Sequence, residues 1–252
     1  QQAIKKFNPE IVIHFAAESH VDNSIKSPGK FIQSNILGTY NILRSINKKI
    51  FLVHISTDEV YGHVINNKSF SETTKYNPRS PYSASKASAD HLVSAWNSTY
   101  GYKSTIVNCC NNFGPNQDKE KFIPVIINNI LNNKKIPIYG NGKQKREWIY
   151  VDDFVASIDF IISKNLFKEN FVIGSGIRFE NKIFAKKIKS LFKNKLNYDE
   201  KKIKLIRVSD RPGHDIEYKI DSSKLRKLGW KPKTNISNDL LKTINFYKTK
   251  NK

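Results

Sequence analysis

The chain has 252 residues, enough to bury a sizeable core in one large domain or two smaller ones. Hydrophobic residues make up 38%, charged residues 26%, and no apolar run approaches the ~20 residues that cross a bilayer, so we expect a cytoplasmic protein with no membrane partner. The net charge is +21, but the lysines are spread along the chain and form no single block with interleaved aromatic residues, so we expect a lysine-rich solvated surface and no nucleic-acid partner.

The N-terminal stretch QQAIKKFNPE resembles the middle of a helix that runs into a turn, and the sequence contains no Met. We therefore expect the chain to be a fragment. Residues 9–17, PEIVIHFAA, predict a strand after a proline turn, and residues 28–47 predict an amphipathic helix.

The next elements continue the alternation of strand and helix. Residues 50–56, IFLVHIS, are typical of a strand covered on both faces, residues 81–101 predict a long helix that ends at Gly101, and residues 104–110, STIVNCC, predict a third strand. Crossover-sized spacing between strands predicts an α/β fold with a doubly wound, parallel, Rossmann-type sheet. Cys109 and Cys110 are expected to be reduced core residues.

Beyond Pro115 the pattern is less regular. It predicts a helix over 121–133, a strand and turn over 136–142, a helix after 150–153, a strand at 170–176, and amphipathic stretches near 180–195 and 236–248. We interpret residues 1–115 as most of a nucleotide-binding domain. Residues 116–252 are interpreted as a smaller substrate-binding α/β part, from which segments return to the first sheet.

Polar residues follow each predicted strand. Asp58 and Glu59 come after the strand at 50–56, residues 16–20 after the first strand, and residues 110–115 after the third. Ligands bind at the carboxyl ends of the strands in an open parallel sheet, so these residues are expected to face one site.

The long helix carries Tyr82 and Lys86, which are four residues apart and lie on one face. An ammonium beneath the phenol would favour the phenolate and lower a pKa that is normally about 10, which makes Tyr82 a candidate base. Such a pair also occurs by chance on solvated helices. Thr57, at the end of the preceding strand, adds a hydroxyl that can bind a substrate oxygen.

Thr57, Tyr82 and Lys86 reproduce a Thr-Tyr-Lys triad, and here the sequence resembles the extended short-chain dehydrogenase/reductase superfamily. Within it, the resemblance is to the dTDP-glucose 4,6-dehydratase family. The adjacent acids Asp58 and Glu59 indicate this subgroup, because epimerases and decarboxylases would resemble SS-x-x-VYG over residues 56–62. The resemblance covers the whole chain and is carried by residues 14–25, 54–62, 80–93, 108–124, 139–153 and 210–221.

The resemblance implies a lyase that converts dTDP-glucose to dTDP-4-keto-6-deoxyglucose with NAD as cofactor. Tyr82 would take the C4 hydroxyl proton as hydride passes to NAD. Glu59 would then remove the C5 proton, Asp58 would protonate the departing C6 oxygen, and the hydride would return to C6. Two adjacent carboxyls can act as base and acid if their surroundings hold them in opposite protonation states.

Supporting residues and partners are implied in the same way. The expected cofactor-binding residues, besides Tyr82 and Lys86, are Ala16, Ala17, Glu18, Ser19, Asn35 and Thr39. The expected substrate-binding residues are Asn112, Glu120, Lys121, Tyr139, Arg146 and Arg211, the two arginines as pyrophosphate clamps. A homodimer through the helix of Tyr82 and the helix at 31–47 is the family expectation.

The sequence departs from the family pattern at Cys110, Phe113, Lys119 and Glu147, none of them in the proposed triad or acid pair. The G-x-x-G-x-x-G turn that binds the NAD pyrophosphate is absent, and we expect two strand–helix units, roughly 60–80 residues, before Gln1.

Alternatives stay open at this point. They are a UDP-sugar epimerase or decarboxylase of the same superfamily, and an inactive sugar-nucleotide-binding remnant without the NAD glycine motif. No metal is expected, because His14, His20 and His214 do not have a metal-ligand spacing.

Overall fold

The computed structural model describes residues 1–199 and 202–250 of the chain. Its α-helices are α1 (Gln2–Phe7), α2 (Val21–Lys26), α3 (Pro28–Phe31), α4 (Gly38–Leu43), α5 (Pro81–Tyr100), α6 (Phe122–Leu131), α7 (Val151–Ser163), α8 (Asn181–Leu196), α9 (Ser223–Lys227) and α10 (Ile236–Lys250). A π-helix, η1 (Ile32–Leu37), lies between α3 and α4, and a 3-10 helix, η2 (Asp58–Tyr61), follows the second strand. The strands are β1 (Ile11–His14), β2 (Phe51–Thr57), β3 (Lys103–Cys109), β4 (Asn111–Phe113), β5 (Ile136–Tyr139), β6 (Lys145–Tyr150), β7 (Phe171–Ile173), β8 (Arg178–Glu180) and β9 (Leu205–Val208).

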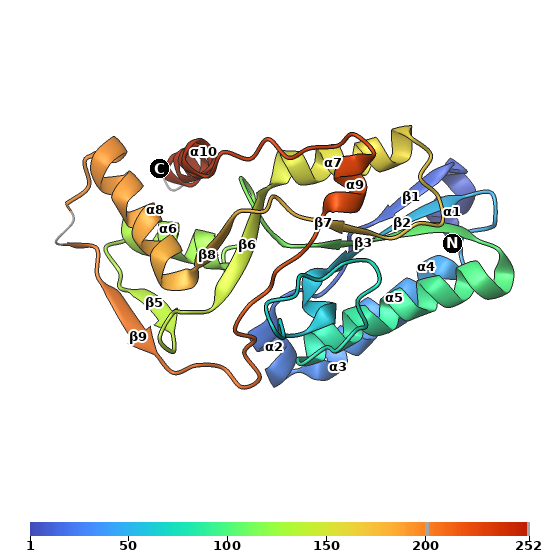
Figure 1. Cartoon of the computed structure of the whole chain (residues 1–252), viewed down its shortest axis with the longest axis horizontal. Coiled ribbons are helices and arrows are strands. Elements are labelled where there is room, and N and C mark those ends of the chain that lie inside the picture. The colour runs from blue at the N-terminus through green and yellow to red at the C-terminus, as the bar shows by residue number, and fades with distance from the viewer. Residues whose placement is uncertain (200–201, 251–252) are drawn as a thin grey trace.

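The larger layer is a four-stranded sheet in the order β1-β2-β3-β7, and every neighbouring pair is parallel. Helices α4 and α5 cover one face and α7 and α9 the other, as Figure 1 shows. This arrangement confirms the predicted doubly wound α/β fold. The fourth strand, β7, comes from beyond residue 116 and pairs with β3, with Val107 opposite Phe171.

The second part of the molecule is built on a three-stranded sheet, β4-β6-β8, and a two-stranded sheet, β5-β9. Helices α6, α8 and α10 lie around these strands on the left of Figure 1 and enclose a separate core. Strands β4, β6, β8 and β9 were not predicted. They are short, and β6 and β9 contain charged residues that hide the apolar pattern of a strand. Among the described residues, no helix is long and apolar enough to cross a membrane.

The helix expected over residues 28–47 is interrupted. It begins as α3 at Pro28, continues as the π-helix η1, and ends as α4 at Leu43. The wider π turn contains Asn35, which is fully buried and donates to the Ser85 hydroxyl on α5. The polar contacts of Asn35 thus lie at the point where the helix departs from regular α geometry.

Helix α5 has well-defined ends. Ser80 and Ser83 form a capping box, Pro81 occupies the first turn, and Gly101 ends the helix in the left-handed conformation with φ +71°. The buried face includes Tyr82, Lys86 and Asp90 at intervals of four residues. The expected helix at 81–101 is therefore confirmed, and its ends fix which face meets the sheet.

The loop after η2 depends on Gly62, which has φ +74° and whose added Cβ would overlap the carbonyl oxygen of Asn77. We expect Gly62→Ala to lower the free energy of unfolding by about 3 kcal/mol, because strain and a backbone clash add. Gly101→Ala is the matched control: it has φ +71° but open space around the new Cβ, so it should cost only about 1 kcal/mol. Urea unfolding of both variants measures the difference, and equal losses would contradict the steric argument.

Candidate active site

The two adjacent acids lie where β2 ends and η2 begins. Thr57 caps η2, and its hydroxyl oxygen accepts a hydrogen bond from the Glu59 backbone N–H at 3.3 Å. Asp58 is 1% exposed, whereas Glu59 is partly exposed. At the carboxyl edge of the sheet, the strand end therefore places one carboxyl inside the protein and leaves the other partly exposed.

Asp58 is set up to hold a proton. Burial raises the pKa of its carboxyl well above the usual value of 3.8, and the neighbouring Glu59 and Glu147 raise it further. The Thr57 hydroxyl donates to Asp58 Oδ1 at 3.3 Å, while Asp58 Oδ2 is buried and has no hydrogen-bond partner among the described residues. A neutral carboxyl with one unengaged oxygen can donate a proton to a bound ligand.

Glu59 has different surroundings. Burial raises the pKa of its carboxyl, but the positive charges of Arg211, Arg146 and Lys121 oppose that rise. The Tyr218 hydroxyl also lies 3.4 Å from Glu59 Oε2. Three cations around one carboxyl favour its ionised form, so the surroundings of Glu59 and Asp58 differ in the direction that a base and an acid require.

Tyr82 and Lys86 lie beside this pair, but the expected lowering of the Tyr82 pKa is wrong for this structure. Burial raises the pKa of the phenol well above 10, and the charge of Glu59 raises it further. The Lys86 ammonium donates to the backbone carbonyl of Ile55 at 2.7 Å rather than to the phenol. A hydrogen bond with Thr57 favours the phenolate, so Thr57 and Tyr82 are brought together, with Lys86 one helical turn away on the same buried face of α5.

The loop after β1, residues 15–20, is fixed to the helices that follow it. Asn35 accepts from the Glu18 backbone N–H at 2.9 Å and donates to the Glu18 carbonyl at 3.0 Å. Thr39 donates to the Asn35 carbonyl at 2.7 Å and contacts His14 at 3.2 Å. Asn35 and Thr39 therefore shape the loop that was expected to contact a cofactor.

An open pocket of about 380 Å³ lies at this end of β1, lined by His14, Ala16, Ala17, Glu18, Ser34, Gly38 and Ile42. Its small side chains leave room for a flat ring, and the backbone and the Glu18 carboxylate provide polar groups. This set of groups fits one end of a dinucleotide such as NAD.

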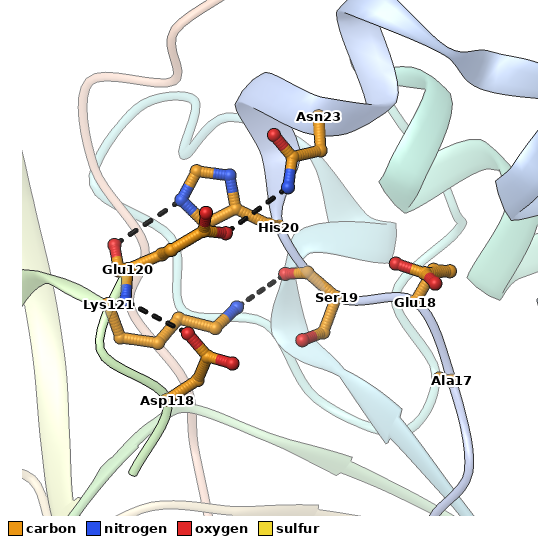
Figure 2. A pocket seen from close by; sticks show the side chains of 8 residues that line it. All are labelled: Ala17, Glu18, Ser19, His20, Asn23, Asp118, Glu120 and Lys121. Atoms are coloured by element: carbon orange, nitrogen blue, oxygen red, sulfur yellow. Dashed lines mark hydrogen bonds between the residues drawn. The ribbon is translucent and has the colours of Figure 1, made fainter.

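A second pocket, of about 170 Å³, joins the β1 loop to the segment before α6 (Figure 2). Lys121 Nζ donates to the Ser19 carbonyl at 2.5 Å, and Asn23 Nδ2 donates to Glu120 Oε2 at 3.2 Å. Burial lowers the pKa of Lys121, while the nearby Glu59 opposes that change. Glu120 and Lys121 thus border the predicted cofactor loop, and Lys121 also lies near Glu59.

The remaining predicted substrate residues differ in whether their side-chain atoms already have hydrogen-bond partners in the protein. Asn112 donates to Cys110 O at 3.2 Å, and its Oδ1 is buried without a partner among the described residues, so it can accept from a ligand. Tyr139 and Arg211 both contact the Asp22 carboxylate on α2, at 3.0 and 3.5 Å.

Arg146, which the sequence suggested as a pyrophosphate clamp, is buried and held by the protein itself. It is 5% exposed, donates to the backbone carbonyls of Lys145 and Asp215 at 2.8 Å each, and lies 4.2 Å from the centre of the Tyr218 ring. Backbone acceptors and an aromatic ring hold its guanidinium in place, and its charge acts on Glu59. Its pyrophosphate role stays a prediction.

Several residues of the site were missed from the sequence. Tyr218 donates to Asp215 Oδ2 at 2.7 Å, and Arg79 pairs with Asp215 Oδ1 at 3.2 Å. Tyr218 and Asp215 belong to the stretch 210–221 that carried the resemblance, so a position-by-position examination of that stretch could have found them. Asp22 likewise belongs to the stretch 14–25 that carried the resemblance.

The raised pKa of Asp58 predicts how stability depends on pH. The folded state binds more protons than the unfolded state between pH 3.8 and the raised pKa, so burying Asp58 lowers stability as pH rises through that interval. We expect Asp58→Asn to raise the free energy of unfolding at pH 7 and to leave it nearly unchanged at pH 3. Denaturant unfolding at both values tests this, with Asp159→Asn on the exposed side of α7 as the control. A loss of stability at pH 7 would contradict the assignment.

Comparison with known proteins gives related sequences and folds. The model of the GDP-mannose 4,6 dehydratase family matches residues 1–243. A dTDP-glucose 4,6-dehydratase from Escherichia coli is 42% identical over 95% of this chain and 73% of its own length, and one from Haemophilus influenzae is 39% identical over 98% and 78%.

Solved structures agree with these relatives. The dTDP-glucose 4,6-dehydratase DesIV from Streptomyces venezuelae, with NAD and TYD bound, has a TM-score of 0.89 and 36% identity over 98% of this chain and 76% of its own. A UDP-glucose 4-epimerase from Thermotoga maritima with UDP-glucose has a TM-score of 0.90 but only 25% identity, over 100% of this chain and 81% of its own. The fold is thus shared by both enzyme types, while sequence identity favours the dehydratases. The chain belongs to the GDP-mannose 4,6 dehydratase family and, within it, groups with the dTDP-glucose 4,6-dehydratases.

Proposed function

We propose that the protein is an NAD-dependent lyase that converts dTDP-glucose to dTDP-4-keto-6-deoxyglucose. The observation that carries the proposal is the pair of adjacent carboxyls beside the Tyr82 phenol: burial raises the pKa of Asp58 well above its usual value, whereas three cations oppose the same rise at Glu59. The relatives named as dTDP-glucose 4,6-dehydratases, and the DesIV structure with NAD and TYD, support the same substrate and cofactor. NAD, when bound, accepts the hydride from C4 and returns it to C6.

Residues of the β1 loop and α5 are proposed to hold the cofactor. Ala16, Ala17, Glu18 and Ser19 line its path, and the buried Asn35 keeps that loop in position through its bonds to Glu18. Lys86 places its ammonium near the end of β2, where it donates to the Ile55 carbonyl.

Tyr82 takes the proton of the C4 hydroxyl, with the Thr57 hydroxyl bound to the same oxygen. Burial of the phenol opposes this step, because it raises the pKa. The positive charge of Lys86, one helical turn away, favours the phenolate. The site therefore depends on charge from Lys86 to make the base competent.

Loss of water is assigned to the two acids. Glu59, whose ionised form is favoured by the charges of Arg211, Arg146 and Lys121, takes the C5 proton. Asp58 gives the proton from its unengaged Oδ2 to the C6 hydroxyl oxygen, the C6–O bond breaks, and water leaves. Glu59 then returns a proton to C5. Acid and base groups of this kind contribute about 10²–10⁴-fold each to the rate.

A UDP-sugar epimerase or decarboxylase of the same fold is the second candidate, supported by the fold match to the epimerase. Inverting a hydroxyl at C4 needs no acid–base pair for water loss, so it leaves Asp58 and Glu59 without a task. A binding protein without catalysis likewise gives no reason for a neutral Asp58 beside an ionised Glu59.

We expect Glu59→Gln in the full-length protein to retain oxidation at C4 and to form the 4-keto-6-deoxy product at least ~10²-fold more slowly, because only the C5 base is removed. Absorbance of reduced nicotinamide follows the first step, and NMR of the sugar follows the product. Asp159→Asn, on the exposed side of α7, serves as the control and should react normally. Unimpaired product formation by Glu59→Gln would refute its role, and conversion of UDP-glucose alone would favour the epimerase.

We also propose a cytoplasmic homodimer formed through α5 and the η1–α4 segment. Ile32, Leu37, Tyr40 and Tyr100 are large apolar side chains between 38% and 51% exposed along these helices. A second copy would cover them.

Leu37→Lys should convert the dimer to a monomer, because each copy then places a charge in the apolar contact. Light scattering gives the mass. Ile183→Lys on α8, with a similar exposure of 51%, is the control and should leave the mass unchanged. A wild-type monomer, or a dimer that survives Leu37→Lys, would contradict this interface.

A further inference from the structure

A buried carboxylate lies behind the proposed base and has no role in the steps above. Asp90 on α5 is 1% exposed. Its Oδ2 accepts from the Ser56 hydroxyl at 2.8 Å, the Tyr76 hydroxyl at 3.0 Å and Asn108 Nδ2 at 3.1 Å, and its Oδ1 lies 3.2 Å from His54 Nε2. Four side chains from β2, β3 and the loop before α5 converge on one carboxylate.

The position of Asp90 in the helix connects this cluster to the proposed base. Tyr82, Lys86 and Asp90 follow one another at intervals of four residues and share the buried face of α5. Lys86 donates to the carbonyl of Ile55, and Asp90 accepts from the next residue along β2, Ser56. Two consecutive residues of β2 are thus bound by two consecutive turns of the helix.

The titratable groups of β1, β2 and β3 that lie around Lys86 carry no negative charge. His54 on β2 and His14 on β1 have pKa values lowered by burial, that of His14 to about 4, so both rings are neutral at pH 7. Burial raises the pKa of the Cys109 thiol on β3 to about 12, so it is also neutral. Burial lowers the pKa of Lys86 itself, and Asp90 is the largest influence that opposes this change.

The donors to Asp90 are neutral as well. Tyr76 has a pKa raised by burial and by the charge of Asp90, while Ser56 and Asn108 carry no charge. These groups satisfy the hydrogen bonds of the carboxylate without compensating its charge. The charge of Asp90 is therefore left for a cation on the same buried face.

We propose that Asp90 is a positioning residue of the active site: its carboxylate is the buried counter-charge that keeps Lys86 protonated and holds the Tyr82–Lys86 face of α5 against the end of β2. This inference rests on the proposed function for the importance of Lys86, but the pairing of the two charges is independent of the reaction. Asp90 touches no reacting atom and acts through Lys86.

The direct test is the titration of Lys86 in the protein without ligands. Lysine labelled with ¹³C at Cε reports its protonation, and the Lys86 signal is identified by its loss in Lys86→Arg. In Asp90→Asn, which keeps the size of the side chain and removes its charge, the midpoint should fall by about one pH unit or more. An unchanged midpoint would overturn the proposal.

Two matched variants separate charge from packing. Ser56→Ala removes one hydrogen bond to Asp90 but leaves its charge, and Asp239→Asn neutralises a buried aspartate of α10 that is not among the groups acting on Lys86. Both should leave the Lys86 midpoint in place. A shift as large in either variant as in Asp90→Asn would assign the effect to altered packing and overturn the proposal.

Reciprocity supplies a second measurement if Asp90→Asn does not fold. The coupling of two charges is mutual, so Lys86→Gln should raise the pH at which the ¹³Cγ signal of Asp90 titrates. An unmoved Asp90 signal would overturn the pairing.

Activity adds a readout that a merely structural role would not move. The high-pH limit of kcat for Asp90→Asn should shift downward by the same amount as the Lys86 midpoint, with KM unchanged. A shifted midpoint with an unshifted activity profile would overturn the positioning role. If the wild-type protein forms no product, the proposed function fails, while the titration still decides the pairing of Asp90 and Lys86.

Discussion

The contact between the end of β2 and the buried face of α5 is the constraint on which the candidate site depends. Lys86 binds the Ile55 carbonyl, and Asp90 binds Ser56 and His54, so the helix has one position along the strand. Thr57 ends that strand, and Asp58 and Glu59 follow it directly. A shift of α5 along β2 would therefore separate the Tyr82 phenol from all three residues.

Placing so many ionisable groups together has a cost, because burial disfavours every charge. The fold offsets this cost by giving the two neighbouring carboxyls, Asp58 and Glu59, different electrostatic surroundings. Burial raises the pKa of Asp58, which favours its neutral form, while Glu59 faces cations from three separate segments, around residues 121, 146 and 211. Three basic residues of this strongly basic chain thus act on one carboxyl of the site, although most of its lysines lie on the surface.

The sequence predicted the parts of the fold that have strong local signals. The helix α5 has a capping serine, a proline in its first turn and a terminal glycine, and β2 and β3 are almost entirely buried and rich in branched side chains. The strands that were missed, such as β6 and β8, are short or charged and are stabilised by pairing with distant segments, for example Arg146 opposite Phe179. The π turn at Ile32–Leu37 likewise depends on contacts of Asn35 with Glu18 and Ser85, which no local pattern reveals.

The sequence by itself determined the alternation of strand and helix, the family, and the order of the acid pair, Tyr82 and Lys86 along the chain, because local spacing encodes these features. Only the tertiary structure decided the charge states and the partners. Whether Asp58 is neutral depends on burial by residues far away in the chain, and whether Lys86 faces the phenol or the Ile55 carbonyl depends on how α5 meets β2. Protonation and side-chain direction depend on the three-dimensional surroundings, and a one-dimensional pattern does not contain them.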